Sequence, residues 1–93
     1  MEPTAVFKEH SSVVEDVAWN AVEANIFASV GDDKRLLLWD VRAGSSPTTN
    51  IEAHFAEVMS VDFSPFDANL IVTGAGDCAV AVWDRRNLKS KLF

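Results

Sequence analysis

The chain has 93 residues, of which 48% are hydrophobic, and its 14 acidic and 8 basic side chains give a formal net charge of -6. No apolar run approaches the roughly 18 residues of a membrane helix, no charged-then-apolar leader begins the sequence, and the single cysteine, Cys78, excludes an internal disulfide and a multi-thiolate metal site. We therefore expect a soluble globular chain of the nucleus or cytoplasm with no cofactor, no metal, no membrane contact and no direct nucleic-acid binding, whose acidity favours basic protein partners.

Strand-like segments separated by turn signals follow one another along the chain. After Ala5–Phe7, the first set of expected strands lies near Val14–Trp19, Ile26–Val30, Leu36–Asp40 and Thr48–Ile51. The second set lies near Val58–Phe63, Leu70–Gly74, Ala79–Asp84 and roughly Lys89–Phe93. Residues typical of turns, namely Gly, Asn, Asp, Ser and Pro, separate these segments, and the stretch from Gly44 to Thr49 is the clearest loop.

The two sets are copies of one unit with a period of 44 residues, because Trp39-Asp40 recurs as Trp83-Asp84 (83 − 39 = 44). A period of roughly 40–45 residues ending in Trp-Asp is the signature of a four-stranded propeller blade. We therefore predict an all-β chain of two four-stranded antiparallel blades, at residues 9–51 and 52–93, with residues 1–8 as a poorly anchored outer strand of a preceding blade. Propellers need about four to eight blades to close, so we expect a fragment or an obligate oligomer, and one able to self-associate.

A helix must be weighed for Val13–Ala28, because its apolar residues include a run spaced i, i+3, i+4 and i+7. The second copy of this segment contains Pro65, which breaks a helix, and is rich in β-branched residues. Since two copies of one unit share one structure, we predict strands in both.

Each copy carries a His, a Ser or Thr, an Asp and a Trp at matching positions: His10, Ser29, Asp33, Trp39, and His54, Thr73, Asp77, Trp83. In proteins with Trp-Asp (WD) repeats, which the chain resembles over nearly its whole length, these groups form a buried relay from indole N–H to hydroxyl to imidazole to carboxylate. A catalytic Ser/His/Asp triad uses the same residue types, but duplication at the blade period favours a structural device, and a nucleophile needs an exposed hydroxyl beside an oxyanion site. A two-histidine metal site is disfavoured because the two histidines belong to different blades. We therefore expect a structural relay and no enzyme activity.

Beyond the repeat, several segments resemble consecutive middle blades of the retinoblastoma-associated histone-binding (MSI-like, chromatin-assembly factor small subunit) family: Phe7–His10, Val13–Trp19, Ser29–Asp33, Trp39–Arg42 and Trp83–Lys89. The resemblance implies a fragment of a seven-bladed propeller. It also implies a non-enzymatic nuclear scaffold that binds basic histone segments and assembles the subunits of chromatin complexes. The family's N-terminal helix and acidic insertion have no counterpart here, so the histone-helix site they form is not carried over.

The resemblance further implies a partner-binding surface at the top of the propeller, formed by Val13, Glu15, Asp32, Glu57, Met59 and Gly76. The family reads a basic tail with an acidic side chain at the place of Glu15, four residues before Trp19. The alternative is that Glu15 and Asp32 are ordinary solvated turn acids.

A Trp-Asp-x-Arg motif also occurs twice, with Asp40 and Arg42 repeated as Asp84 and Arg86. It resembles the box by which propeller receptors dock on the adaptor of cullin-RING ubiquitin ligases, so substrate receptor of such a ligase is the main alternative function. Because residues two apart on a strand point to one face, these pairs could instead simply stabilise the blade. A generic protein-interaction propeller, of the kind used in ribosome assembly or peroxisomal import, is a further alternative.

Overall fold

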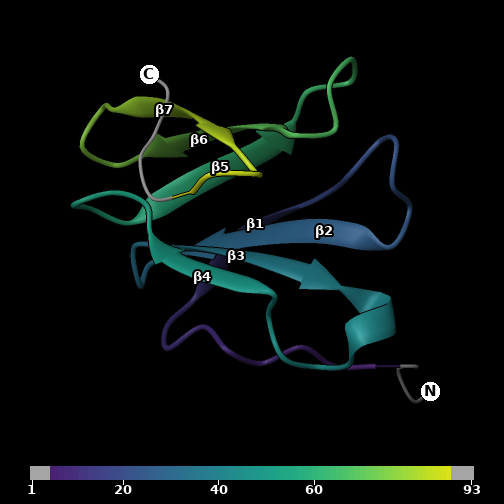
Figure 1. The fold of residues 1–93 in the computed structure, drawn as a ribbon. Coiled ribbons are helices and arrows are strands. Elements are labelled where there is room, and N and C mark those ends of the chain that lie inside the picture. The colour runs from purple at the N-terminus through teal and green to yellow at the C-terminus, as the bar shows by residue number, and fades with distance from the viewer. Residues whose placement is uncertain (1–4, 89–93) are drawn as a thin grey trace.

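The computed structural model describes residues 5–88, which form two antiparallel sheets lying one over the other (Figure 1). The first sheet has the strand order β1 (Val14–Trp19), β2 (Ile26–Gly31), β3 (Arg35–Asp40) and β4 (Thr49–Glu52), with a short 3-10 helix, η1 (Val41–Ala43), after β3. The second sheet has the order β5 (Val58–Phe63), β6 (Leu70–Ala75) and β7 (Val80–Asp84). The prediction of an all-β chain is therefore confirmed, and the helical alternative for Val13–Ala28 is excluded. Within residues 5–88, no helix is long and apolar enough to cross a membrane.

The N-terminal segment differs from its prediction. Residues 5–8 have no regular secondary structure, because a strand requires a hydrogen-bonded neighbour and none of the described strands pairs with them. The segment is nevertheless anchored, since the Phe7 ring lies 5.1 Å from that of Trp39 and 5.2 Å from that of Phe27, both edge-on. The expectation of a poorly anchored stretch is thus wrong for Phe7. The strand predicted near Lys89–Phe93 lies outside the described residues.

The two sheets reproduce one backbone geometry at the 44-residue offset. A β-bulge interrupts pairing between Val14 and Asp16 in β1, and again between Val58 and Ser60 in β5. The β2–β3 and β6–β7 turns each contain a non-glycine residue in the left-handed region, Lys34 at φ 69° and Cys78 at φ 68°. Because left-handed non-glycine residues are uncommon, their recurrence 44 residues apart shows that the repeat is structural as well as sequential.

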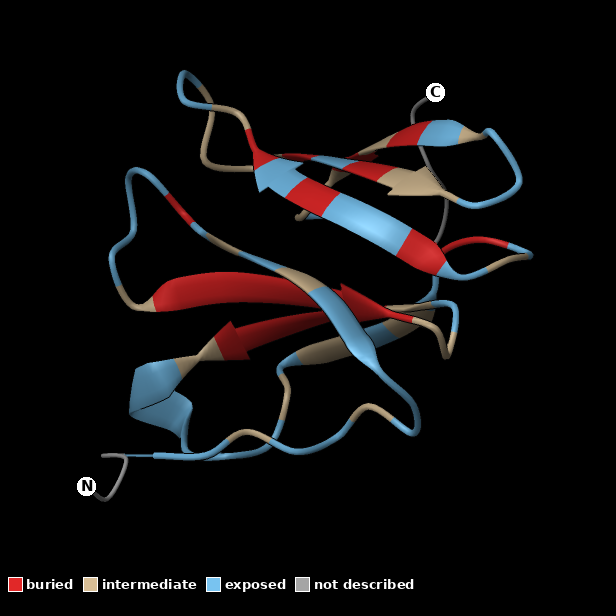
Figure 2. Cartoon of the chain, turned by 180° about the vertical axis from the view of Figure 1, so that it is seen from behind, coloured by how far each residue is buried: buried red, intermediate tan, exposed pale blue. Residues whose placement is uncertain are grey.

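The main core lies between the two sheets. Figure 2 shows β2 and β3 buried along most of their length, whereas β5 alternates between buried and exposed residues. Both faces of β2 and β3 are covered, since a smaller cluster of Phe7, Phe27, Leu37 and Trp39 packs on the side away from the second sheet. The inter-sheet core consists mainly of Ile26, Ala28, Val30, Leu36 and Leu38 from the first sheet, and Val58, Val61, Phe63, Ile71, Ala81 and Trp83 from the second.

Polar contacts fix the register of one sheet on the other. The Asp16 carboxylate accepts a hydrogen bond from the backbone amide of Val61 at 3.0 Å, which joins β1 to β5. Asn20 Nδ2 donates to the carbonyl of Ala68 at 2.9 Å, while its Oδ1 accepts from two amides of its own turn. Buried polar groups are costly unless they are paired, so Asn20, only 4% exposed, both closes its turn and links the sheets.

Candidate functional site

The four predicted relay groups of the first sheet lie together on the face of that sheet that points away from the second sheet. Trp39 Nε1 donates to Ser29 Oγ at 2.9 Å, and Ser29 Oγ lies 2.7 Å from His10 Nε2. His10 Nδ1 lies 2.9 and 3.0 Å from the two carboxylate oxygens of Asp33. The side chains of His10 and Asp33 are 4% and 5% exposed. The chain therefore holds a continuous hydrogen-bonded path from a strand β3 indole to a turn carboxylate.

Donor and acceptor capacities set the direction of this path. An indole N–H can only donate, so Ser29 Oγ accepts from Trp39 and has one proton left for His10 Nε2. The proton on Nδ1 then points to Asp33. This arrangement contains the atoms of a catalytic triad, but Ser29 is only 4% exposed and its hydroxyl already contacts both Trp39 and His10. All buried side-chain polar atoms in the described part of the chain have hydrogen-bond partners, as a structural network requires.

The second sheet repeats the indole, hydroxyl and imidazole contacts with the same distances. Trp83 Nε1 donates to Thr73 Oγ1 at 2.9 Å, and Thr73 Oγ1 lies 2.7 Å from His54 Nε2. Both Thr73 and His54 are buried. This relay lies in the inter-sheet core, because Trp83 belongs to it.

The carboxylate of the second copy departs from the predicted burial. Asp77 is exposed and accepts a hydrogen bond from the Ala79 amide at 3.0 Å, within its own turn. In the first copy, the backbone amide of Ser11 donates to Asp33 at 3.0 Å and covers that carboxylate. The residue 44 positions after Ser11 is Phe55, which is 89% exposed. At the position of Ser11, whose amide bonds to the first carboxylate, the second copy therefore carries an exposed side chain.

The carboxylates of Glu15, Asp32 and Glu57 lie close together at one edge of the two sheets, near the ends of β1, β2 and β5. We call this group of three residues the acidic rim. A hydrogen bond that the protonated Glu15 carboxyl donates to the neighbouring Asp32 carboxylate, together with the negative charge of Asp32, raises the pKa of Glu15 above its ordinary value. Partial desolvation and the charge of Glu57 act in the same direction. Like charges resist ionising together, so these groups are held near enough to repel one another.

The other predicted top-surface residues frame the acidic rim. The Val13 carbonyl accepts from the Asp32 amide at 2.8 Å, and the Glu57 carbonyl accepts from the Gly76 amide at 2.9 Å, which are matching contacts in the two sheets. A β-carbon at Gly76 would collide with the Glu57 carboxylate, so the glycine leaves room for that side chain. Met59 and Val13 are 48% and 60% exposed. The structure thus gives this edge both charge and accessible apolar surface.

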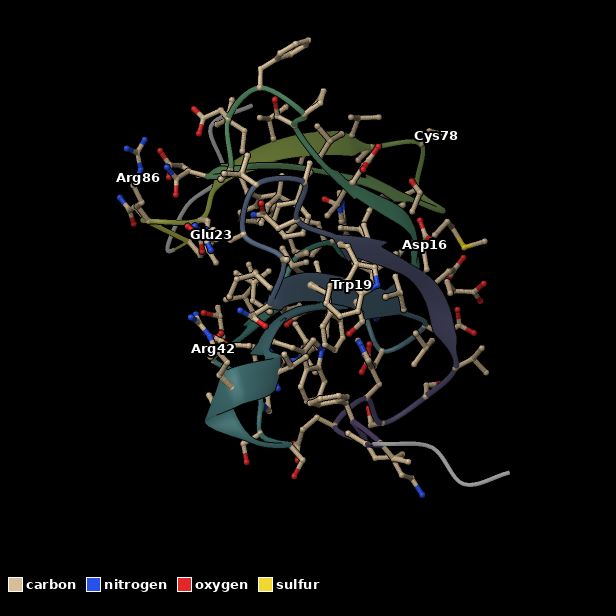
Figure 3. All side chains as sticks on the ribbon, turned by 90° about the vertical axis from the view of Figure 1, so that its right-hand side faces the viewer. Asp16, Trp19, Glu23, Arg42, Cys78 and Arg86 are labelled. Atoms are coloured by element: carbon tan, nitrogen blue, oxygen red, sulfur yellow. The ribbon has the colours of Figure 1, made fainter. Side chains whose placement is uncertain are left out.

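The two Asp/Arg pairs lie at the opposite edge, near Glu23 (Figure 3). Arg42 Nε and Nη2 donate to the two oxygens of Asp40 at 3.0 and 2.9 Å, and Arg86 makes the same two contacts with Asp84 at 2.9 and 2.6 Å. The neighbouring guanidinium lowers the pKa of Asp40 and brings that of Asp84 to about 2. Both arginine side chains are 66% exposed.

The pairing does not come from alternation along a strand, as the sequence suggested. Asp40 ends β3 and Arg42 lies in η1, where the Arg42 amide also donates to the Asp40 carboxylate at 2.9 Å. A turn after Asp84 places the Arg86 amide in the same way, again at 2.9 Å. The aspartate therefore caps the turn that brings its arginine back.

A comparison with protein families matches the chain to WD40 (WD domain, G-beta repeat) at residues 1–40 and 45–84. The two matches begin 44 residues apart (45 − 1 = 44) and end 44 residues apart (84 − 40 = 44), which is the offset that relates the bulges, turns and relays. The chain belongs to the WD40-repeat family. WD40 domains are typically non-enzymatic scaffolds that mediate protein–protein interactions, so the family match supports the coarser part of the predicted function, a protein-interaction scaffold.

Sequence reasoning missed the residues that join the two sheets. Asp16 and Asn20 correspond to Ser60 and Ser64 in the second copy, so the repeat marks all four positions as polar. Ser64 Oγ accepts from the amides of its own turn, as Asn20 Oδ1 does. What the alignment does not reveal is the second contact of Asp16 and Asn20, which crosses to the neighbouring sheet.

Proposed function

We propose that this WD40 chain is a nuclear scaffold that binds basic protein segments, of the histone-tail kind, at its acidic rim and so helps assemble chromatin complexes. The observation that carries the proposal is the grouping of Glu15, Asp32 and Glu57 closely enough to raise the pKa of Glu15. Uncompensated carboxylates attract cations, and a Lys or Arg side chain placed among them would relieve their repulsion while forming charge-assisted hydrogen bonds.

The overall charge supports the same direction. A net charge of -6 steers a basic peptide toward the chain over a range set by salt, about 8 Å at physiological ionic strength. The nearby exposed side chains of Val13 and Met59 offer contacts for the aliphatic stems of lysine and arginine. Binding should therefore depend on charge and on salt while tolerating changes in peptide sequence.

The test is a fluorescence titration of a labelled basic histone-tail peptide against the 93-residue chain and its variants, at low and at physiological salt. Glu15→Lys should weaken binding by about tenfold at low salt and by less at physiological salt. Glu15→Gln removes the charge while keeping the shape and should have a smaller effect in the same direction.

Glu23→Gln is the matched control. It makes the same change in an exposed glutamate at the far end of the β1–β2 hairpin, where Glu23 pairs with Arg85 at 2.9 Å. We expect the affinity of this variant to match that of the wild type. Equal affinities for wild type, Glu15→Lys and Glu15→Gln at both salts would refute the assigned site, and an equal loss in Glu23→Gln would reduce the effect to net charge.

The Asp/Arg pairs favour a second candidate, docking on the adaptor of a cullin-RING ubiquitin ligase. The supporting observation is that Arg42 and Arg86 are held in the same two-contact geometry while remaining 66% exposed, so each sheet presents an equally oriented guanidinium. Arginine forks are well suited to bidentate recognition of a partner's carboxylates. Replacing both arginines by alanine should abolish adaptor co-purification and leave the unfolding midpoint unchanged, and retained co-purification would rule out this role.

A further inference from the structure

The outer face of the first sheet, on the side away from the second sheet, is apolar, and over β1 it is open. Trp19, Val17 and Val14 of the edge strand β1 are 57%, 50% and 47% exposed, although the neighbouring strands β2 and β3 are buried. Beside them is a pocket of about 190 Å³, lined by Phe7, His10, Val14, Val17, Phe27, Ser29 and Trp39. We call this surface the receiving face.

Each residue of that pocket has a counterpart 44 residues later, and the counterparts are covered by another sheet. They are Ile51, His54, Val58, Val61, Ile71, Thr73 and Trp83. All but Ile51 are at most 5% exposed, and Ile51 packs against the same core. What covers them is the inner face of the first sheet, through Ile26, Ala28, Val30, Leu36 and Leu38. The receiving face therefore corresponds to the surface of the second sheet that the first sheet covers in the internal sheet-to-sheet contact.

The chain also exposes a surface on the second sheet that corresponds to the covering surface of the first sheet. The residues 44 positions after the covering set are Leu70, Val72, Gly74, Val80 and Val82, which lie on the outer side of β6 and β7. Val72 is 41% and Val80 is 68% exposed. We call this surface the inserting face; it has the apolar character of its counterpart.

Relative to the internal contact, each of the two faces carries a substitution that is chemically complementary to one on the other face. Trp19 takes the place of Phe63, and Asp62 takes the place of Ala18, which packs against the core containing Phe63. A carboxylate introduced into an apolar contact is costly unless it meets a donor. The other change supplies one, because tryptophan adds an indole N–H where the internal contact has only a phenyl ring. In a contact between the two faces, the indole of one would therefore offset the cost of burying the carboxylate of the other.

We infer that the receiving face binds the inserting face of a second copy of this chain, in the geometry of the internal sheet-to-sheet contact. The contact is heterologous, so it joins copies head to tail and either closes into a ring or extends. It uses the broad surfaces of the sheets and does not depend on the peptide-binding role of the acidic rim.

The test blocks each face separately with one charge. Val17→Lys disables the receiving face and Val72→Lys the inserting face, and sedimentation velocity over a range of concentrations measures assembly. The wild type should associate, and each variant alone should remain monomeric. An equimolar mixture of the two variants should form a one-to-one dimer and nothing larger, because only one intact face of each kind remains to be paired.

Trp19 reports the same event. Trp39 and Trp83 are already buried, at 1% and 5% exposed, so burial of Trp19 should shift the tryptophan emission to shorter wavelength in the wild type and in the mixture, and in neither variant alone. Phe66→Lys, at a 95% exposed loop residue outside both faces, is the matched control and should assemble as the wild type does.

Circular dichroism checks that each variant is folded. If Val17→Lys does not fold, Val14→Lys replaces it, and if Val72→Lys does not fold, Val80→Lys replaces it. A folded wild type that stays monomeric at all concentrations overturns the inference. So does a mixture that forms no dimer, or a control variant that dissociates as Val17→Lys does.

Discussion

Replacing Trp83 by phenylalanine tests whether the buried relay stabilises the fold. The change removes the hydrogen bond from Nε1 to Thr73 Oγ1, which spans 2.9 Å, and leaves that hydroxyl with one partner fewer. A net hydrogen bond is worth about 1 kcal/mol. Phenylalanine also has three fewer ring atoms, and at about 0.8 kcal/mol per buried carbon this adds roughly 2 kcal/mol. Because Trp83 is 5% exposed and lies in the inter-sheet core, we expect the free energy of unfolding to fall by about 3 kcal/mol.

The assay is urea denaturation, with the midpoint and slope measured at a concentration where the chain is monomeric. Trp19→Phe is the matched control, because it makes the same chemical change at a residue that is 57% exposed and should alter stability by less than about 0.5 kcal/mol. Equal midpoints for Trp83→Phe and Trp19→Phe would refute the reasoning.

A double-mutant cycle separates the hydrogen bond from the packing. Thr73→Val keeps the shape of the side chain but deprives both the Trp83 indole and the His54 imidazole of their hydroxyl partner, which should cost about 1–3 kcal/mol. Combining it with Trp83→Phe should be less costly than the two changes added together, by about 1 kcal/mol, since one lost bond is then counted only once. Strict additivity would mean that the indole and the hydroxyl do not interact.

Three further predictions concern the links between elements and the charge at the rim. Asn20→Ser should keep the turn cap, as the serine in the corresponding place of the second copy does, but lose the bond to the second sheet, lowering the free energy of unfolding by about 1 kcal/mol in the same denaturation assay. The affinity for a basic peptide should fall as the pH is lowered through the raised pKa of Glu15, and titrations of Glu15→Gln over the same pH range should lack this contribution. Gly31→Ala should destabilise the chain by about 1–3 kcal/mol, because its β-carbon would collide with backbone, whereas Gly76→Ala meets only a movable side chain and should cost less; equal midpoints in urea would contradict this.

The raised pKa of Glu15 also affects how the stability of the fold depends on pH. The pKa of Glu15 is raised in the folded chain, so the folded state holds this proton more tightly than the unfolded state. Its contribution therefore favours folding at low pH and is lost as the pH rises through the folded pKa. Glu15→Gln should accordingly be no less stable than the wild type at neutral pH, which identifies the rim as a feature that does not serve stability.

The positions of the strands could be predicted because the sequence contains two copies of one unit. A single copy of Val13–Ala28 is ambiguous between helix and strand, and Pro65 in the second copy resolves the ambiguity for both. The observed β1 and β5 have the predicted bounds, Val14–Trp19 and Val58–Phe63. The same comparison marks the indole, hydroxyl and imidazole of each relay as matching positions, and the resemblance to WD-repeat proteins implies the contacts among them, which the structure contains.

What the repeat could not predict is where the two copies meet different surroundings. Asp33 is enclosed because the Ser11 amide reaches it, whereas the segment following His54 carries the exposed Phe55. Arg42 lies in a 3-10 turn that follows from the capping carboxylate of the preceding aspartate, which strand alternation does not anticipate. Contacts between sheets, such as that of Asp16 with the Val61 amide, depend on how one unit lies on the next.

The acidic rim and the two assembly faces occupy different parts of each blade, and this separation follows from strand geometry. Glu15 and Asp32 lie at the β1–β2 strand ends beside the β2–β3 turn, and Glu57 directly precedes β5, whereas Val17 and Val72 lie within strands and project from sheet surfaces. If copies add head to tail in the geometry of the internal contact, the sheet-to-sheet arrangement that places Glu57 near Glu15 recurs from copy to copy, so every rim faces the same edge of the assembly. A longer basic segment would then meet several rims at once, with an effective concentration set by their spacing. Assembly would thus strengthen binding without a new contact, which is why the two sites have to be tested by variants that leave the other site intact.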